Sequence, residues 1–132
     1  MFTKKLTVAC IVLASSLNAN SLSNCENLVG SWKGSYLYPA NGVTNEYQVT
    51  FNNDHSSSEV MSLKAPDNSL MKHRQQGTWT CDGNEFSITV PTQTGVKVSN
   101  HYRVMEMTSD HQKFQHYHKG NAGPIFDLRR TK

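Results

Sequence analysis

Hydrophobic and polar residues alternate with a period of two along most of this chain, and no stretch of ten or more residues shows a helical stripe. In the segment LVGSWKGSYLYP, residues 28–39, one face carries Gly30, Trp32, Gly34, Tyr36 and Tyr38. Period-two alternation is typical of a β-strand that buries one of its faces. The pattern therefore predicts a half-buried strand whose inner face alternates glycine with large aromatic residues.

The same alternation predicts further strands joined by short turns. They are expected in residues 45–51, 58–64, 75–81, 85–90, 95–108, 109–119 and 125–130, with turns at 52–55, 65–68 and 120–124. Asp82 and Gly83 are predicted to be the two turn residues of a tight hairpin, and a change of phase near Val104 and Met105 predicts a β-bulge. Eight strands with short connections favour an all-β antiparallel barrel or closed sandwich.

Residues 1–19 are predicted to be a secretory signal peptide. Lys4 and Lys5 precede an apolar run from Leu6, and Ala19 supplies a small residue at the expected cleavage point. The run is too short and too interrupted for a transmembrane helix, which needs about 20 apolar residues. We therefore expect residues 20–132 to be one secreted or periplasmic domain, and the short signal peptide suggests a bacterial source.

Charge and cysteine content narrow the function further. Removing residues 1–19 leaves 11 Lys and Arg against 10 Asp and Glu, scattered along the chain, so no nucleic-acid partner is expected. Cys25 and Cys81 also remain, and an even number of cysteines in an exported chain favours a disulfide over a metal or redox role. The expected bridge between them is structural.

Three features together resemble the lipocalin and wider calycin pattern, in particular the small bacterial lipocalin-like domains. They are Gly30 and Trp32 as a Gly-x-Trp motif on the first strand, a meander of eight strands, and Arg129 or Arg130 on the last. The resemblance implies an up-and-down barrel in which the first strand pairs with the last and Trp32 closes one end beneath the arginine. A guanidinium over an indole contributes about 0.5–2 kcal/mol, and glycines beside the indole relieve crowding.

An eight-stranded barrel is either filled by its side chains or holds one small ligand. We expect an exported binding module for a small apolar or amphipathic molecule, without a cofactor and acting as a monomer. The side chains expected to contact the ligand are Tyr36, Tyr47, Trp79, Tyr102, Arg103 and Phe114.

An alternative function stays open at this point. The segment WTCDGNEFSITV resembles the cysteine-bearing strand of bacterial lysozyme inhibitors. A filled barrel would then bind a secreted host or bacterial protein, as a lysozyme or protease inhibitor does, through loops at residues 39–45, 64–74 and 119–124.

Residues capable of catalysis or metal binding form no complete set. His116 and His118 share a strand face and His101 lies on the preceding strand, so these three are the candidates if a metal binds. Solvent-facing or barrel-mouth positions are the favoured explanation, and no metal site is expected. No G-x-S-x-G motif is present. The carboxylates are expected to be solvated surface charges, and no enzyme activity is expected; those considered are Glu59, Asp82, Glu85 and Asp110.

Overall fold

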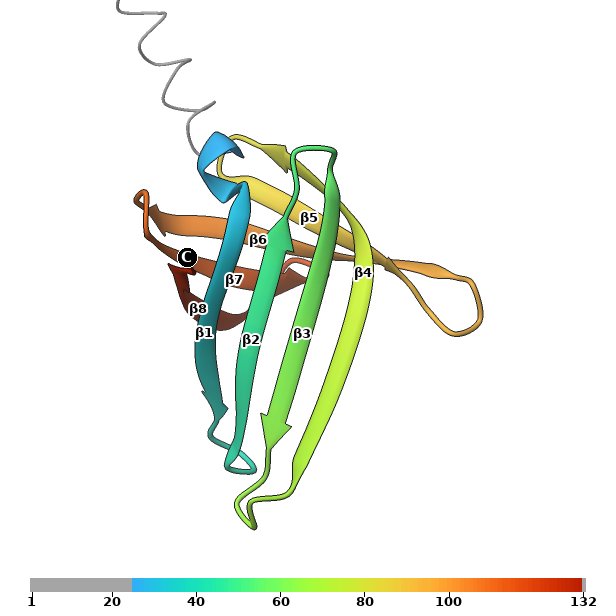
Figure 1. Ribbon diagram of the computed structural model, residues 1–132, viewed down its shortest axis with the longest axis vertical. Helices are drawn as coiled ribbons and strands as arrows, with labels where there is room; N and C mark the ends of the chain where they lie inside the picture. The colour runs from blue at the N-terminus through green and yellow to red at the C-terminus, as the bar shows by residue number, and fades with distance from the viewer. Residues whose placement is uncertain (1–24, 132) are drawn as a thin grey trace, which may run out of the picture.

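Strands dominate residues 25–131, the part of the chain that this computed structural model describes. The predicted signal peptide lies outside the described residues. Within them, eight strands form a closed antiparallel barrel in chain order (Figure 1), which confirms the predicted fold class. The strands are β1 (Gly30–Tyr38), β2 (Val43–Phe51), β3 (Ser56–Lys64), β4 (Leu70–Asp82), β5 (Glu85–Pro91), β6 (Lys97–Met107), β7 (His111–His118) and β8 (Asn121–Arg130).

The β4–β5 hairpin turns one residue later than predicted. Asp82 pairs with Glu85, so the two turn residues are Gly83 and Asn84 rather than Asp82 and Gly83. Gly83 has a φ of +62°, and a two-residue turn that begins with such a glycine fits type II′. The predicted β-bulge is confirmed, because the register between β6 and β7 shifts between Val104 and Glu106.

Two other segments are more extended than the sequence indicated. The predicted turn at 120–124 is wrong, since β8 already begins at Asn121 and the turn consists of Lys119 and Gly120, both with positive φ. Pro124 is tolerated within β8 because the register shifts beside it. β4 begins at Leu70, and residues 70–74 are exposed, so they carry no burial pattern that the sequence could reveal.

Two glycines of β1 allow the barrel to close. Gly34 pairs with Leu128 of β8, and a Cβ at this glycine would lie 2.3 Å from the carbonyl oxygen of Asp127. Gly30 has a φ of +129°, and a Cβ there would lie 2.3 Å from Nη1 of Arg130. The glycines therefore leave room for the backbone of β8 and for the arginine that covers the indole.

Trp32 closes one end of the barrel as expected, with its side chain 0% exposed. Its Nε1 donates to the carbonyl oxygen of Leu28 at 2.9 Å. Arg130, and not Arg129, covers the indole, with Cζ 4.2 Å from the ring centroid. The Arg130 guanidinium also donates to the carbonyl oxygens of Val29 and Asn27, each at 2.7 Å. These contacts join the last strand to the helical turn at residues 25–28.

The substitution Arg130→Lys is expected to lower the free energy of unfolding by about 2 kcal/mol, because one ammonium cannot replace a planar group that stacks and donates in several directions. Urea denaturation measures the loss. Arg129→Lys is the matched control, since Arg129 is exposed and its substitution should change stability by less than about 0.5 kcal/mol. Equal effects of the two substitutions would contradict the role given to Arg130.

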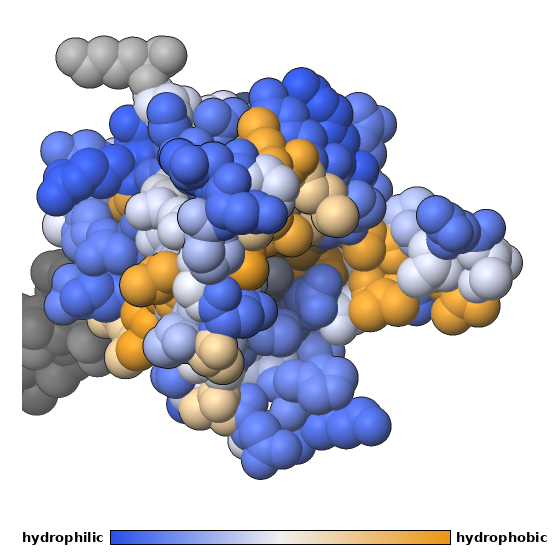
Figure 2. All heavy atoms as spheres, turned by 90° about the horizontal axis from the view of Figure 1, so that it is seen from below, coloured by the Kyte–Doolittle hydropathy of each residue, from blue (hydrophilic) through white to orange (hydrophobic). Residues whose placement is uncertain are grey.

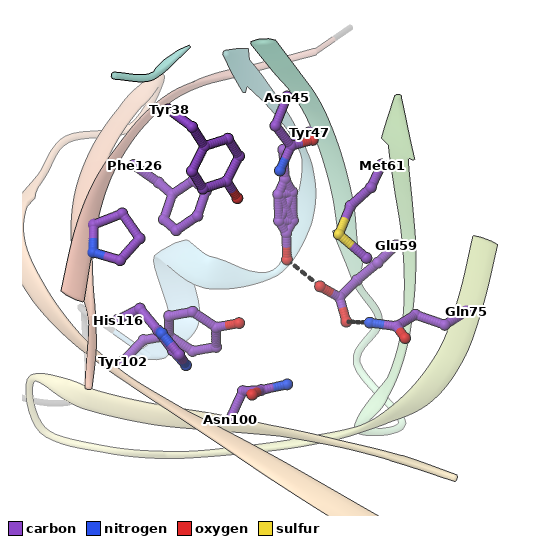
Figure 3. A pocket seen from close by; sticks show the side chains of 11 residues that line it. Tyr38, Asn45, Tyr47, Glu59, Met61, Gln75, Asn100, Tyr102, His116 and Phe126 are labelled. Carbon is purple, nitrogen blue, oxygen red and sulfur yellow. Dashed lines mark hydrogen bonds between the residues drawn. The ribbon is translucent and has the colours of Figure 1, made fainter. Parts of the chain in front are cut away.

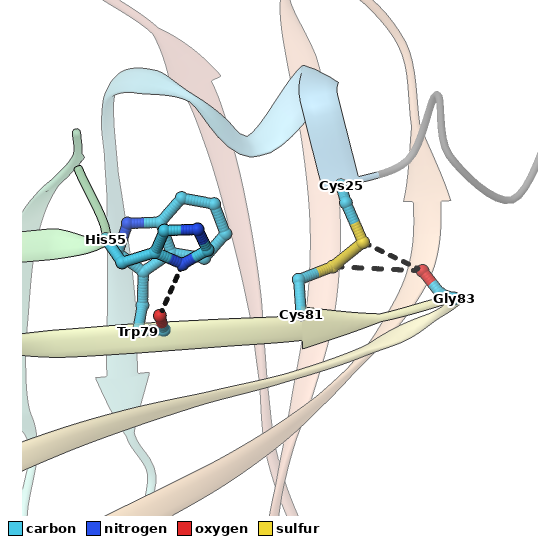
Figure 4. The surroundings of a disulfide bond; sticks show 5 residues. All are labelled: Cys25, His55, Trp79, Cys81 and Gly83. Atoms are coloured by element: carbon cyan, nitrogen blue, oxygen red, sulfur yellow. Dashed lines mark hydrogen bonds between the residues drawn. A yellow bond between two sulfur atoms is a disulfide. The ribbon is translucent and has the colours of Figure 1, made fainter. Parts of the chain in front are cut away.

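The predicted disulfide between Cys25 and Cys81 is confirmed. It joins the helical turn at residues 25–28 to the end of β4, beside the β4–β5 turn (Figure 4). The bridge therefore holds the turn whose carbonyl groups accept hydrogen bonds from Trp32 and Arg130. Among residues 25–131, no helix has the length and apolar character needed to cross a membrane.

Candidate functional site

The interior of the barrel is filled at one end and hollow at the other. Around Trp32 it is packed with apolar side chains such as Phe51, Phe86, Ile88 and Leu128. Toward the end where β1 joins β2 and β3 joins β4, a cavity of about 190 Å³ opens to solvent. Figure 2 looks onto this end and shows a recess between hydrophobic and hydrophilic residues.

We call this space the mouth cavity. Its volume is below the roughly 300 Å³ at which pockets for drug-sized ligands begin, and close to the roughly 150 Å³ of an engineered cavity that admits benzene. It is therefore large enough for a molecule about the size of one ring. The lining residues are Tyr38, Asn45, Tyr47, Glu59, Met61, Gln75, Asn100, Tyr102, His116, Pro124 and Phe126.

A buried carboxylate lies in the wall of the mouth cavity. Glu59 of β3 is 4% exposed, accepts a short hydrogen bond from the hydroxyl of Tyr47, and accepts a second from Nε2 of Gln75 at 3.1 Å (Figure 3). The hydroxyl groups of Tyr38 and Tyr102 point into the same space. A carboxyl group and several hydroxyls thus share a cavity whose other walls are largely aromatic.

The expectation that Glu59 is a solvated surface charge is wrong. Glu59 pairs with Gln75 across β3 and β4, and both side chains point into the barrel. The alternation along the strand predicts an inward position for Glu59, because Glu59, Met61 and Leu63 are two residues apart and lie on the same, more apolar face of β3. The other three carboxylates considered are exposed as expected; they are Asp82, Glu85 and Asp110.

Burial changes the protonation of the groups around the mouth cavity. Desolvation raises the pKa of Glu59, although the hydrogen bonds from Tyr47 and Gln75 and the charge of His73 act in the opposite direction. Desolvation also raises the pKa of the Tyr47 and Tyr102 hydroxyls, and the Glu59 charge raises both further. Both tyrosines therefore remain neutral donors at physiological pH.

The substitution Glu59→Gln is expected to stabilise the protein increasingly as pH rises. Because the folded state raises the pKa of Glu59, the folded state loses stability as pH increases through that value, and a glutamine does not. Melting temperatures of the two proteins should be similar near pH 4 and separate in favour of the variant by pH 8. Glu46→Gln, at an exposed position of β2, is the control and should not separate. A constant difference across this range would contradict the interpretation.

The residues predicted to contact a ligand fall into three groups. Tyr47 and Tyr102 line the mouth cavity. Tyr36 and Phe114 lie behind its wall: Tyr36 contacts the ring of Phe126, and Phe114 contacts the rings of Phe126 and Tyr102. These two side chains support residues that reach the cavity.

Trp79 and Arg103 lie elsewhere. Trp79 is buried near the closed end, where it stacks on His55 (Figure 4) and its Nε1 donates to the carbonyl oxygen of Asn52 at 3.0 Å. Arg103 is exposed on the outer face, pairs with Glu85 at 3.1 Å and lies over the ring of Tyr117. Since neighbouring residues of a strand point to opposite faces, Arg103 and Tyr102 cannot both point inward.

The three histidines considered as metal ligands do not line one site, because His101 and His118 share a surface pocket that His116 does not line. His116 lines the mouth cavity, next to the ring of Tyr102, whereas His101 and His118 are exposed. Desolvation lowers the pKa of His116, and the charges of His118 and His101 lower it further. Residues 25–131 contain no group of three or more His, Cys, Asp or Glu side chains arranged to hold a metal ion.

Several lining residues were not among the predicted ligand contacts. Two of them, Tyr38 and Phe126, are aromatic but were not chosen as contacts. Most of the others are polar, so an aromatic pattern does not detect them; they are Asn45, Glu59, Met61, Gln75, Asn100, His116 as a cavity residue, and Pro124. The position of each residue along its strand would have found many of them, because residues two apart point to the same face. Asn45 therefore shares the inner face with Tyr47, and Gln75 shares it with Gly77 and Trp79.

Comparison with known proteins identifies the type of domain. Residues 28–114 match a family described as the lipocalin-like domain, a match that runs from just before β1 into β7. No curated protein matches the chain significantly. Because the matched segment is well over half of the 132 residues, and because the described residues form a closed barrel, the chain belongs to the lipocalin-like domain family.

Proposed function

We propose that this protein is an exported, monomeric binding protein that holds a small amphipathic molecule in the mouth cavity. Lipocalin-like domains commonly bind small hydrophobic ligands and are typically not enzymes. The observation that carries the proposal is the buried polar group of Glu59, Tyr47 and Gln75 inside a cavity with aromatic walls. Apolar side chains would fill this space at lower cost, because a buried carboxylate is expensive to desolvate.

The size and chemistry of the cavity favour an amphipathic ligand over a purely apolar one. Rings such as those of Phe126 and Tyr102 offer apolar contact, while the Glu59 carboxylate, which accepts hydrogen bonds from Tyr47 and Gln75, has acceptor sites left for a polar group of the ligand. Few, fixed hydrogen-bonding groups in an apolar space determine the orientation of a small molecule. The predicted contacts Tyr47 and Tyr102 keep their proposed role.

The cavity supports this function over that of a protein-binding inhibitor with a filled barrel. The alternative placed binding in loops at 39–45, 64–74 and 119–124. Much of each segment is strand, since β2 begins at Val43, β4 at Leu70 and β8 at Asn121. The connections are therefore shorter than the segments that the alternative named.

Export supports the same function. A disulfide between Cys25 and Cys81 is typical of proteins in oxidising compartments. The sequence of residues 1–19 fits a cleaved signal peptide, and we infer that the protein is secreted or periplasmic after cleavage near Ala19. Mass spectrometry of the exported protein is expected to give a chain that begins at Asn20.

NMR titration with two neutral probes, benzyl alcohol and indole, tests the binding function. Saturable shifts are expected for the side-chain amides of Asn45, Gln75 and Asn100, which line the cavity. Asn100→Phe places a ring in the cavity and should abolish these shifts. Ser99→Phe adds the same ring at the neighbouring, exposed position of β6 and should leave them intact.

Two results would overturn the proposed function. One is the absence of saturable shifts with either probe. The other is equal binding by the wild type and by Asn100→Phe, because the probes would then bind outside the mouth cavity. Loss of binding in Asn100→Phe alone would support it.

A further inference from the structure

The mouth cavity presents a carboxylate that forms no ion pair in the described part of the chain, although the charge of His73 acts on it from outside the cavity lining. Glu59 accepts hydrogen bonds only from neutral donors, the hydroxyl of Tyr47 and the amide of Gln75. A carboxylate has about four acceptor sites, so acceptor capacity remains. Neither of the ion pairs found within residues 25–131 includes Glu59. A cation that entered the cavity would offset the cost of burying this charge.

A second acceptor in the cavity is also without a partner. Asn45 is 3% exposed, and its Oδ1 has no hydrogen bond in the structure. The side chain belongs to the same face of β2 as Tyr47 and lines the same space as Glu59 (Figure 3). A buried acceptor without a donor costs about 1–3 kcal/mol, so Asn45 adds to the cost of the polar wall of the cavity. An ammonium group carries three donors, which the remaining acceptor sites of Glu59 can receive.

The remaining walls favour a cation and disfavour an anion. Tyr38, Tyr102 and Phe126 supply aromatic rings, which attract cations. Among residues 25–131, no Lys or Arg side chain lines the cavity, and the lowered pKa of His116 favours its neutral form. A ligand carboxylate would therefore find no permanent positive charge there, and it would be repelled by Glu59 wherever that group is ionised.

We propose that the mouth cavity selects small organic ammonium ions, with the ammonium group hydrogen-bonded to Glu59 and the apolar part against Tyr102 and Phe126. This inference rests on the proposed binding function and adds the chemical class of the ligand. The cavity volume of about 190 Å³ limits that ligand to a compact amine, of the size of one ring with a short chain.

Isothermal titration with three probes of nearly the same shape tests the selectivity: benzylamine, benzyl alcohol and benzoate. Benzylamine is expected to bind about 10- to 100-fold more tightly than benzyl alcohol, the range for hydrogen bonds to a charged group, and benzoate more weakly than either. Glu59→Gln should reduce the preference for the amine over benzyl alcohol to less than about threefold. Glu46→Gln removes an exposed carboxylate from β2 and should leave the preference unchanged.

Each outcome decides the inference. Equal affinity for the amine and the alcohol, a preserved preference in Glu59→Gln, or tighter binding of benzoate would overturn the ligand class while the binding function stands. Failure of all three probes, together with failure of indole in the NMR titration, would overturn both proposals. If Glu59→Gln does not fold, the wild-type affinities still test the inference, because it requires benzylamine to bind more tightly than benzyl alcohol and benzoate to bind most weakly.

Discussion

Replacing Trp32 with alanine is expected to lower the free energy of unfolding by about 3–5 kcal/mol, the range for truncation of a large buried aromatic residue. The indole is fully buried, and its loss leaves a void at the closed end. The carbonyl oxygen of Leu28 loses its donor, and the Arg130 guanidinium loses the ring that it covers. Urea denaturation followed by circular dichroism measures the change.

Two further variants show whether the effect comes from closing the barrel. Trp32→Phe retains a ring but lacks the indole N–H, so an intermediate loss is expected. Leu37→Ala removes a side chain that is 58% exposed on the same strand and should cost less than about 0.5 kcal/mol. A loss below about 1 kcal/mol for Trp32→Ala would show that the indole does not hold the closed end together.

The sequence predicted the strands wherever one face of a strand is buried. Trp32 and its neighbours alternate clearly because the inner face of β1 packs into the barrel and the outer face meets solvent. Residues 70–74, the first five residues of β4, were not predicted as strand because their side chains are exposed on both faces. Without burial there is no hydrophobic period for a strand to display.

The candidate site was harder to predict for two physical reasons. Alternation tells which face a side chain occupies but not its height along the barrel, so Trp79 and Tyr47 had the same pattern although only Tyr47 reaches the mouth cavity. Selection by residue type then discarded Glu59, because a carboxylate is rarely buried. Buried polar residues are the informative exceptions in such a barrel.

The two halves of the barrel have separate physical tasks. The closed half contains Trp32, Arg130 and most of the apolar core, so it supplies stability. The open half contains Oδ1 of Asn45, which has no hydrogen-bond partner, and the buried carboxyl group of Glu59, which is costly to desolvate. Variants at the closed end should therefore change unfolding, and variants at the mouth should change binding.

Removal of the disulfide by Cys25→Ser with Cys81→Ser is expected to cost about 4 kcal/mol, because the bridge closes a loop with a sequence separation of 56 in the unfolded chain. That is a large fraction of the stability of about 5–15 kcal/mol that is usual for proteins. Urea denaturation of the wild type with and without reductant should reproduce the loss, and the double serine variant should not respond to reductant.

The bridge also acts on the folded state, and a double-mutant cycle separates this contribution. Cys25 anchors the helical turn at residues 25–28, where the carbonyl of Asn27 accepts a hydrogen bond from Arg130. Once the turn is released, Arg130→Lys should cost less than it does in the bridged protein, so the two losses should not add. Additive losses would mean that the bridge acts only by restricting the unfolded chain. Because the mouth cavity lies at the opposite end of the barrel, benzyl alcohol should bind the serine variant as tightly as it binds the wild type, as long as the variant remains folded.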